Sequence, residues 1–87
     1  MAITMMVFTR VGCIECEKLQ PIIGTFKERY PDVSVVELDL DNCPDAQRKY
    51  NIQRTPTMIL FEGEEAVEIM QGLMPVSVLD DAMEELQ

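Results

Sequence analysis

Two cysteines, separated by two residues, stand between an apolar run and a helix-like stretch near the start of the chain. The run Ile3 to Phe8 is almost continuously apolar, which is typical of a strand buried on both faces. Cys13 and Cys16 follow this run. The apolar residues after them have the spacing of one helix face: Leu19, Ile22, Ile23, Phe26 and Tyr30. A thiol pair at a strand-to-helix junction therefore constrains both the fold and the chemistry of the chain.

The middle of the chain predicts a second strand and a short helix. Val33 to Leu40 is rich in β-branched residues and alternates at Val36, Leu38 and Leu40, as a strand does. Pro44 to Tyr50 reads as a short helix, because proline suits a first helical turn. A strand, a long helix and a second strand form a right-handed parallel unit.

The remainder predicts a hairpin and a final helix. Thr57 to Phe61 and Ala66 to Met70 are expected strands, with Gly63 supplying the turn between them. A helix from about Pro75 would bury the following residues: Leu79, Ala82, Met83 and Leu86. The order βαβαββα indicates an α/β fold, in which three helices flank a four-stranded mixed sheet as a three-layer sandwich.

Length and charge limit the possible functions. The 87 residues allow a single domain, 1–87. A formal net charge of −9 argues against binding to nucleic acid or to anionic membranes. No apolar stretch has the length of a membrane span, and the apolar start lacks the basic region and cleavage site of a leader. The expected location is a reducing cytoplasm, where a close cysteine pair is catalytic or metal-binding.

The position of the pair favours redox chemistry. Cys13 would lie at the helix start, where free N–H groups and the helix dipole stabilise an anion. The thiolate is the attacking species, and we therefore predict Cys13 as the nucleophile. Cys16, one turn later and closer to the interior, would attack the mixed disulfide and release the reduced product. Among the neighbours, Glu15 and Glu17 oppose a thiolate and Arg10 and Lys18 favour it.

Other interpretations of the cysteines remain open. A structural zinc site needs four Cys or His ligands, and the chain has three Cys and no His. A metal or iron–sulfur cluster would therefore require Asp or a second subunit. A redox-switch module, in which the disulfide controls partner binding, is a further alternative. Cys43 is expected to be a small apolar filler or an exposed bystander outside the pair.

These residues, with others later in the chain, resemble the thioredoxin family. The resemblance covers Met5 to the last helix and rests on these motifs: Cys13-Ile14-Glu15-Cys16, Pro21, Tyr50-Asn51-Ile52-Gln53-Arg54-Thr55-Pro56-Thr57, Glu62-Gly63-Glu64 and Gly72. It implies a thioredoxin-like sandwich and a thiol–disulfide oxidoreductase that reduces protein disulfides. The implied partners are disulfide-containing proteins and an electron donor like thioredoxin reductase. A monomer without a cofactor is expected.

The resemblance also implies how a substrate would bind. In this family the proline that matches Pro56 follows a cis peptide bond and lies against the cysteine pair. The preceding Thr55 would offer backbone groups to an extended substrate segment. We expect substrate-binding residues at Gly12, Ile14, Thr55, Pro56 and Gly72.

Two departures from the family pattern affect the expected site. Thioredoxins usually carry Trp-Cys-Gly-Pro-Cys, whereas Gly12 precedes the pair here and the chain has no Trp. The family's buried aspartate and its lysine partner correspond to Val7 and Glu37. The usual proton-transfer pair is therefore absent, and Glu37 could replace it only by pointing at Cys16.

Glutaredoxins, which are glutathione-dependent reductases, are the alternative family. Their Cys-Pro-Tyr-Cys and Thr-Val-Pro motifs are absent, and their Gly-Gly pair appears only as Gly72-Leu73. The acidic balance of the chain would also disfavour anionic glutathione. The thioredoxin type is therefore the primary prediction.

Overall fold

The computed structural model describes residues 2–86, and Met1 and Gln87, the ends of the predicted domain, lie outside this range. The elements run in this order: β1 (Ile3–Thr9), α1 (Ile14–Arg29), β2 (Ser34–Asp39), a 3₁₀ turn η1 (Leu40–Asn42), α2 (Pro44–Lys49), β3 (Thr57–Glu62), β4 (Glu65–Gln71) and α3 (Val76–Glu85). The predicted order is confirmed, and most element ends fall within one residue of the expected positions.

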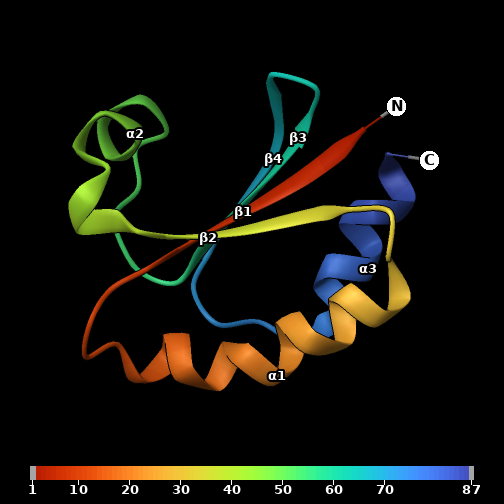
Figure 1. The fold of residues 1–87 in the computed structure, drawn as a ribbon, viewed down its shortest axis with the longest axis horizontal. Coiled ribbons are helices and arrows are strands. Elements are labelled where there is room, and N and C mark those ends of the chain that lie inside the picture. Colours follow the sequence, from red (N-terminus) through yellow and green to blue (C-terminus); the bar gives the residue numbers. More distant parts are fainter. Residues whose placement is uncertain (1, 87) are drawn as a thin grey trace.

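The strands form one mixed sheet over the described part of the chain. Its order is β2-β1-β3-β4, with β1 parallel to β2 and antiparallel to β3, and with β3 antiparallel to β4. Figure 1 shows α1 and α3 together on one face of the sheet and α2 on the other. The three-layer arrangement is therefore as predicted.

The sheet separates two apolar clusters because its side chains alternate between the faces. The cluster on the α1 and α3 side contains these buried residues: Met5, Val7, Leu19, Ile23, Phe26, Met58, Leu60, Met70, Leu79, Ala82 and Met83. The cluster on the α2 side contains these: Phe8, Leu40, Ile52, Ile59 and Phe61. Successive residues of β1 contribute to opposite clusters, which explains why its sequence is almost continuously apolar.

The second strand is shorter than the sequence predicted. β2 ends at Asp39, whose carboxylate accepts a hydrogen bond from the N–H of Asp41 at 2.9 Å. This interaction caps the 3₁₀ turn that follows. Leu40 therefore lies in that turn, not in the strand, although it is fully buried as expected of an apolar residue. The Asp-Leu-Asp sequence favours a turn over continued strand because aspartate bonds to its own local backbone.

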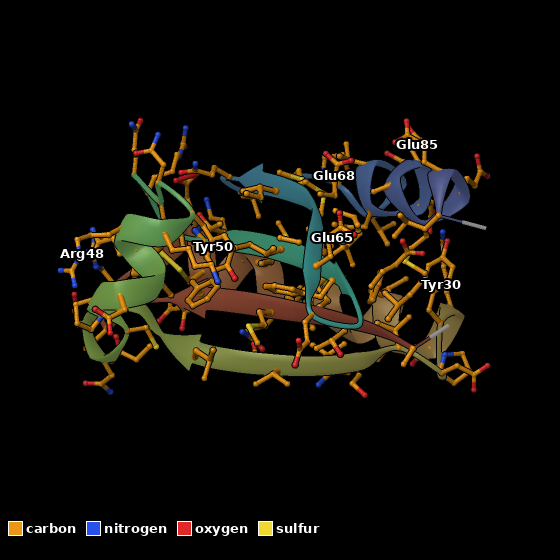
Figure 2. All side chains as sticks on the ribbon, turned by 90° about the horizontal axis from the view of Figure 1, so that it is seen from above. Tyr30, Arg48, Tyr50, Glu65, Glu68 and Glu85 are labelled. Carbon is orange, nitrogen blue, oxygen red and sulfur yellow. A yellow bond between two sulfur atoms is a disulfide. The ribbon has the colours of Figure 1, made fainter. Side chains whose placement is uncertain are left out.

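The molecule is elongated, and its two ends differ. Its principal extents are 32 × 26 × 16 Å. Figure 2 shows Arg48 and Tyr50 at the α2 end and Tyr30 at the opposite end, beside α3. Tyr50 packs edge-on against Phe61, with ring centroids 5.8 Å apart, whereas Tyr30 packs against Phe26.

Candidate redox site

Strand register brings three distant segments to one edge of the sheet. Phe8 pairs with Thr57, and Thr57 pairs in turn with Gln71. The loop after β1, the loop before β3 and the segment after β4 therefore meet at this edge. They carry the cysteine pair, Thr55-Pro56 and Gly72, respectively.

A disulfide joins Cys13 and Cys16 at the start of α1. Cys13 is the N-cap residue, and its Sγ accepts a hydrogen bond from the N–H of Cys16 at 3.1 Å. Cys13 is half-buried, whereas Cys16 is 5% exposed. The expected difference between an accessible and an interior sulfur is confirmed. A helix N-terminus with a free N–H favours negative charge at Cys13 once the disulfide is reduced.

The loop before β3 approaches Cys13 directly. The Thr55–Pro56 peptide bond is cis, as expected, and Pro56 is buried. The hydroxyl of Thr55 lies 3.3 Å from Cys13 Sγ, within hydrogen-bonding distance for a sulfur acceptor. The family resemblance implies that backbone groups of Thr55 bind substrate, but neither it nor the sequence predicted this contact of the Thr55 side chain.

The predicted binding residues lie around the pair in different ways. A cavity of about 430 Å³ is lined by these residues: Arg10, Val11, Gly12, Cys13, Ile14, Glu15 and Thr55. Val11 and Ile14 are 92% and 67% exposed, and they leave apolar surface beside Cys13. Gly72 is buried, and its N–H donates to the carbonyl of Pro56 at 2.7 Å. Gly72 therefore supports the proline loop, and its role in binding stays a prediction.

Two ion pairs flank the cavity. Arg10 Nε contacts Asp41 Oδ1 at 3.0 Å, and Arg54 Nη2 contacts Glu15 Oε1 at 3.5 Å. Arg10 was expected near the pair, but Arg54 was not. The sequence offered two hints of a role for Arg54: its positive charge and its place directly before Thr55-Pro56. Its partner Glu15 lies in a distant segment, and the fold brings the two side chains together.

The alternative base, Glu37, does not contact Cys16 in this structure. It is exposed, and its carboxylate accepts a hydrogen bond from the side-chain amide of Gln20 at 2.7 Å. Its β1 neighbour is Val7, which is fully buried in the apolar core. Glu37 was expected to act as a substitute base only if it pointed at Cys16, and in this structure its carboxylate bonds to Gln20 instead.

The third cysteine lies apart from the pair. Cys43 is unpaired and half-buried, and it packs against the apolar cluster on the α2 side of the sheet. This position agrees with the expected small filler. Among residues 2–86, no cluster of three or more Cys, Asp or Glu could hold a metal ion. Within the same range, none of the helices has the length and apolar character to cross a membrane.

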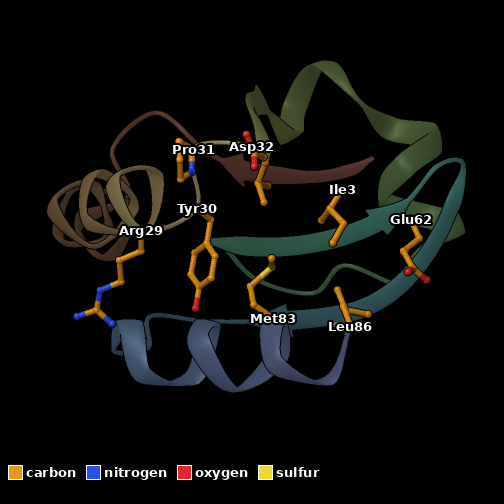
Figure 3. A pocket seen from close by; sticks show the side chains of 9 residues that line it. Ile3, Arg29, Tyr30, Pro31, Asp32, Glu62, Met83 and Leu86 are labelled. Atoms are coloured by element: carbon orange, nitrogen blue, oxygen red, sulfur yellow. The ribbon is translucent and has the colours of Figure 1, made fainter. Parts of the chain in front are cut away.

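A second cavity lies at the opposite end of α1. It has a volume of about 490 Å³ and is lined mainly by the end of α1 and the following turn, together with Ile3, Glu62, Met83 and Leu86. Figure 3 shows the Tyr30 ring across this cavity, with its hydroxyl directed toward α3. That hydroxyl donates to Asp80 Oδ1 at 2.8 Å, and Arg29 pairs with the same carboxylate. These polar groups already have partners, and the cavity is separate from the cysteine pair.

The fold and the site define a class of protein: a small α/β domain with a thiol pair at a helix start, facing a cis-proline loop. The family model described as Thioredoxin matches residues 2–85. The chain belongs to the thioredoxin family, and the expected resemblance and fold class are confirmed.

Individual relatives agree with this assignment. The chain is 30% identical to Thioredoxin-1 of Saccharomyces cerevisiae over 71 residues, which cover 82% of this chain and 69% of that protein. It is 31% identical to Thioredoxin-2 of Pyricularia oryzae over 68 residues, or 78% of this chain and 40% of that protein. A rice relative, Thioredoxin H5, is likewise matched over only 48% of its length. The chain therefore spans less than half of these last two relatives.

Solved structures show the same fold. Oxidized mitochondrial Thioredoxin 3 from Saccharomyces cerevisiae has a TM-score of 0.85 at 24% identity, covering 95% of this chain and 77% of that one. A mutant thioredoxin from Halobacterium salinarum has a TM-score of 0.84 at 29% identity, covering 95% of this chain and 73% of that one.

Proposed function

We propose that the protein is a thiol–disulfide oxidoreductase that reduces disulfides in protein substrates. The observation that carries the proposal is the environment of the Cys13 sulfur. It accepts from the N–H of Cys16 at 3.1 Å and lies 3.3 Å from the Thr55 hydroxyl. These donors would stabilise a thiolate in the reduced protein, since hydrogen bonds to a charged form favour it. Cys16 is 5% exposed and is bonded to Cys13 in the disulfide, and we assign the second step to it.

The reaction requires two exchanges of sulfur bonds. In the reduced protein, the Cys13 thiolate attacks one sulfur of a substrate disulfide, forms a mixed disulfide and expels the other sulfur as a thiolate, which takes up a proton. Cys16 then loses its proton to solvent and attacks Cys13 Sγ. The Cys13–substrate bond breaks, the second substrate sulfur leaves as a thiolate, and the Cys13–Cys16 disulfide forms. The substrate gains two electrons, and the protein loses two.

The surface around Cys13 supports an extended protein segment as the substrate. Exposed Val11 and Ile14 provide apolar contact, and the Thr55-Pro56 loop runs beside the sulfur. We propose that Gly12, Ile14, Thr55 and Pro56 form the binding groove, with Gly72 beneath the loop. The backbone groups of Thr55 would then pair with an extended substrate segment, as in strand addition.

The same proposal includes an electron donor and a setting. An enzyme like thioredoxin reductase would return two electrons to the Cys13–Cys16 disulfide, completing an electron-transfer cycle. We propose that the protein acts as a monomer in a reducing cytoplasm. The unpaired thiol of Cys43 is compatible with a reducing compartment, because thiols stay reduced there.

Insulin reduction in the presence of dithiothreitol tests the function. We expect the wild-type protein to accelerate insulin precipitation and Cys13→Ser to abolish that acceleration, since serine cannot form the mixed disulfide. Cys43→Ser is the matched control and should retain the full rate. Undiminished acceleration by Cys13→Ser would contradict the proposal.

The alternatives give different results in related measurements. Activity that requires glutathione and glutathione reductase would identify a glutaredoxin-type enzyme. Stoichiometric metal in anaerobically purified protein would indicate a metal or iron–sulfur module. Oxidation-dependent partner binding without turnover would indicate a redox switch.

A further inference from the structure

The Arg54–Glu15 ion pair connects the two halves of the site. Glu15 lies between the two cysteines in the first turn of α1, and Arg54 directly precedes the Thr55-Pro56 loop. Their Nη2 and Oε1 atoms are 3.5 Å apart, and their side chains are 58% and 47% exposed. The pair therefore spans the boundary between α1 and the proline loop on the rim of the site.

Gly72 contacts the Arg54 guanidinium, which also pairs with Glu15. A Cβ atom added at Gly72 would lie 3.2 Å from Arg54 Cζ, so the guanidinium rests over the glycine backbone. Gly72 has a φ of +99°, a conformation that favours glycine. The backbone carbonyl of Arg54 also accepts the Thr57 hydroxyl at 2.6 Å. The arginine is thus held at its backbone, at its guanidinium face and by Glu15.

Arg54 lies where its positive charge can offset the negative charge of Glu15 beside the cysteine pair. The Glu15 carboxylate is negatively charged and lies two residues from Cys13. It therefore disfavours the thiolate form of Cys13, which would place a second negative charge nearby. Arg54 places a positive charge against this carboxylate. The other charged side chains near the pair, in space or in sequence, are Arg10, Glu17, Lys18 and Glu37. Arg10 forms an ion pair with Asp41, and Glu37 accepts a hydrogen bond from the uncharged side chain of Gln20. Arg10 is already engaged by Asp41, and Glu17 adds negative charge on the Cys16 side.

We propose that Arg54 is a positioning residue of the redox site: its charge offsets that of Glu15 and thereby sets how much of Cys13 is thiolate. The proposal rests on the dithiol function proposed above. It assigns opposite effects to the two members of one ion pair. Loss of Arg54 exposes Cys13 to the Glu15 charge, and loss of Glu15 leaves the Arg54 charge in excess.

The test measures the thiolate fraction of Cys13 from its alkylation rate by iodoacetamide between about pH 5 and 10. All variants are made in a reduced Cys43→Ser background, so that Cys13 is the accessible thiol. Because a half-exposed pair interacts weakly, we expect Arg54→Gln to lower the thiolate fraction at pH 7 by about threefold and Glu15→Gln to raise it by about threefold. The double variant should return close to the starting value.

Two controls separate charge from structure. Arg54→Lys keeps the positive charge and should retain most of the thiolate fraction. Arg48→Gln removes an exposed arginine that pairs with Asp45 in α2, away from the site, and should change nothing. Because a thiolate stabilises the reduced state, the equilibrium with dithiothreitol should shift toward the disulfide in Arg54→Gln and toward the dithiol in Glu15→Gln.

The outcomes distinguish this proposal from the underlying function. If the wild-type pair cycles normally but Arg54→Gln and Glu15→Gln shift the thiolate fraction in the same direction, or not at all, the role of Arg54 is wrong and the function stands. If the wild-type pair forms no disulfide with dithiothreitol buffers and reduces no insulin, the function fails and the role of Arg54 fails with it.

Discussion

The Cys13 sulfur receives two polar contacts from different elements. One is the N–H of Cys16 in α1, at 3.1 Å, and the other is the Thr55 hydroxyl before β3, at 3.3 Å. Val7, where the family resemblance implies an aspartate, is a fully buried apolar residue, and the Glu37 carboxylate accepts a hydrogen bond from Gln20. Stabilisation of a thiolate therefore falls to hydrogen bonds and to the helix start rather than to a nearby acid–base group.

Thr55→Val tests the contribution of the hydroxyl. Valine has nearly the same volume, but it cannot donate to Cys13 Sγ. Because hydrogen bonds to charged groups contribute about 1.5–3 kcal/mol, we expect the thiolate fraction at neutral pH to fall by about tenfold or more. The pKa of the Cys13 thiol should rise, which moves its alkylation profile to higher pH. Thr55→Ser keeps the hydroxyl and should resemble wild type; equal profiles for the valine and serine variants would contradict this role.

Local position in the sequence was enough to predict the places of Cys13 and Cys16, because the pair follows a strand and opens a helix, where helix-start rules apply. The cis bond before Pro56 was expected only from the resemblance to the thioredoxin family, and the structure contains it. The Thr55 hydroxyl contact and the Arg54–Glu15 pair could not be predicted in the same way. Both depend on the Phe8–Thr57 register, which decides which residues of two distant loops meet.

A polar link connects the two helices on one face of the sheet. Tyr30, directly after α1, donates its hydroxyl to Asp80 in α3 at 2.8 Å, and Arg29 pairs with the same carboxylate. This hydrogen bond, together with burial and repulsion by the Asp80 charge, raises the pKa of Tyr30 above its ordinary value of 10.0. The link lies at the end of α1 that is opposite to the cysteine pair, and it stabilises the layer that supports the site.

Tyr30→Phe tests this link through the pH dependence of stability. Because the folded-state pKa is raised, the stabilisation is complete below about pH 10 and is lost as pH rises through the folded-state value. We expect the variant to lose about 1 kcal/mol of unfolding free energy at pH 7 and to show a shallower decline above pH 10 than wild type. Urea unfolding at pH 7, 9 and 11 would measure both effects.

The matched control is Tyr50→Phe at the other end of the molecule. The Tyr50 ring packs edge-on against Phe61, and phenylalanine preserves that contact. We expect Tyr50→Phe to leave the unfolding free energy at pH 7 nearly unchanged. A loss at Tyr50→Phe as large as at Tyr30→Phe would show that the Asp80 hydrogen bond is not the cause.

Helices and strands were more predictable than their ends. The periodicity of α1 and the alternation of β3 and β4 reflect burial, and burial follows directly from apolar spacing. The end of β2 was misplaced because Leu40 is apolar and continues the alternation, although Asp39 turns the chain there. Local hydrogen bonding decided this boundary, and an apolar pattern does not report it.

The molecule as a whole has the radius of gyration of an ordinary folded domain of its length. Its radius of gyration is 12.1 Å, close to the value of about 12 Å expected for a folded chain of this size. This supports our proposal of a single domain. The site occupies one edge of the sheet, formed by segments that only the assembled fold brings together, and we therefore expect its chemistry to require the intact chain.

In the proposed mechanism, Cys13 attacks the substrate disulfide and Cys16 resolves the mixed disulfide. Mass spectrometry tests both roles in the reduced Cys16→Ser variant after mixing with disulfide-bonded insulin. Without the resolving thiol, the mixed disulfide should persist. We predict a stable adduct linked through Cys13. An adduct linked through Cys43, or no adduct under conditions in which the wild-type protein reduces insulin, would show that Cys13 is not the attacking thiol.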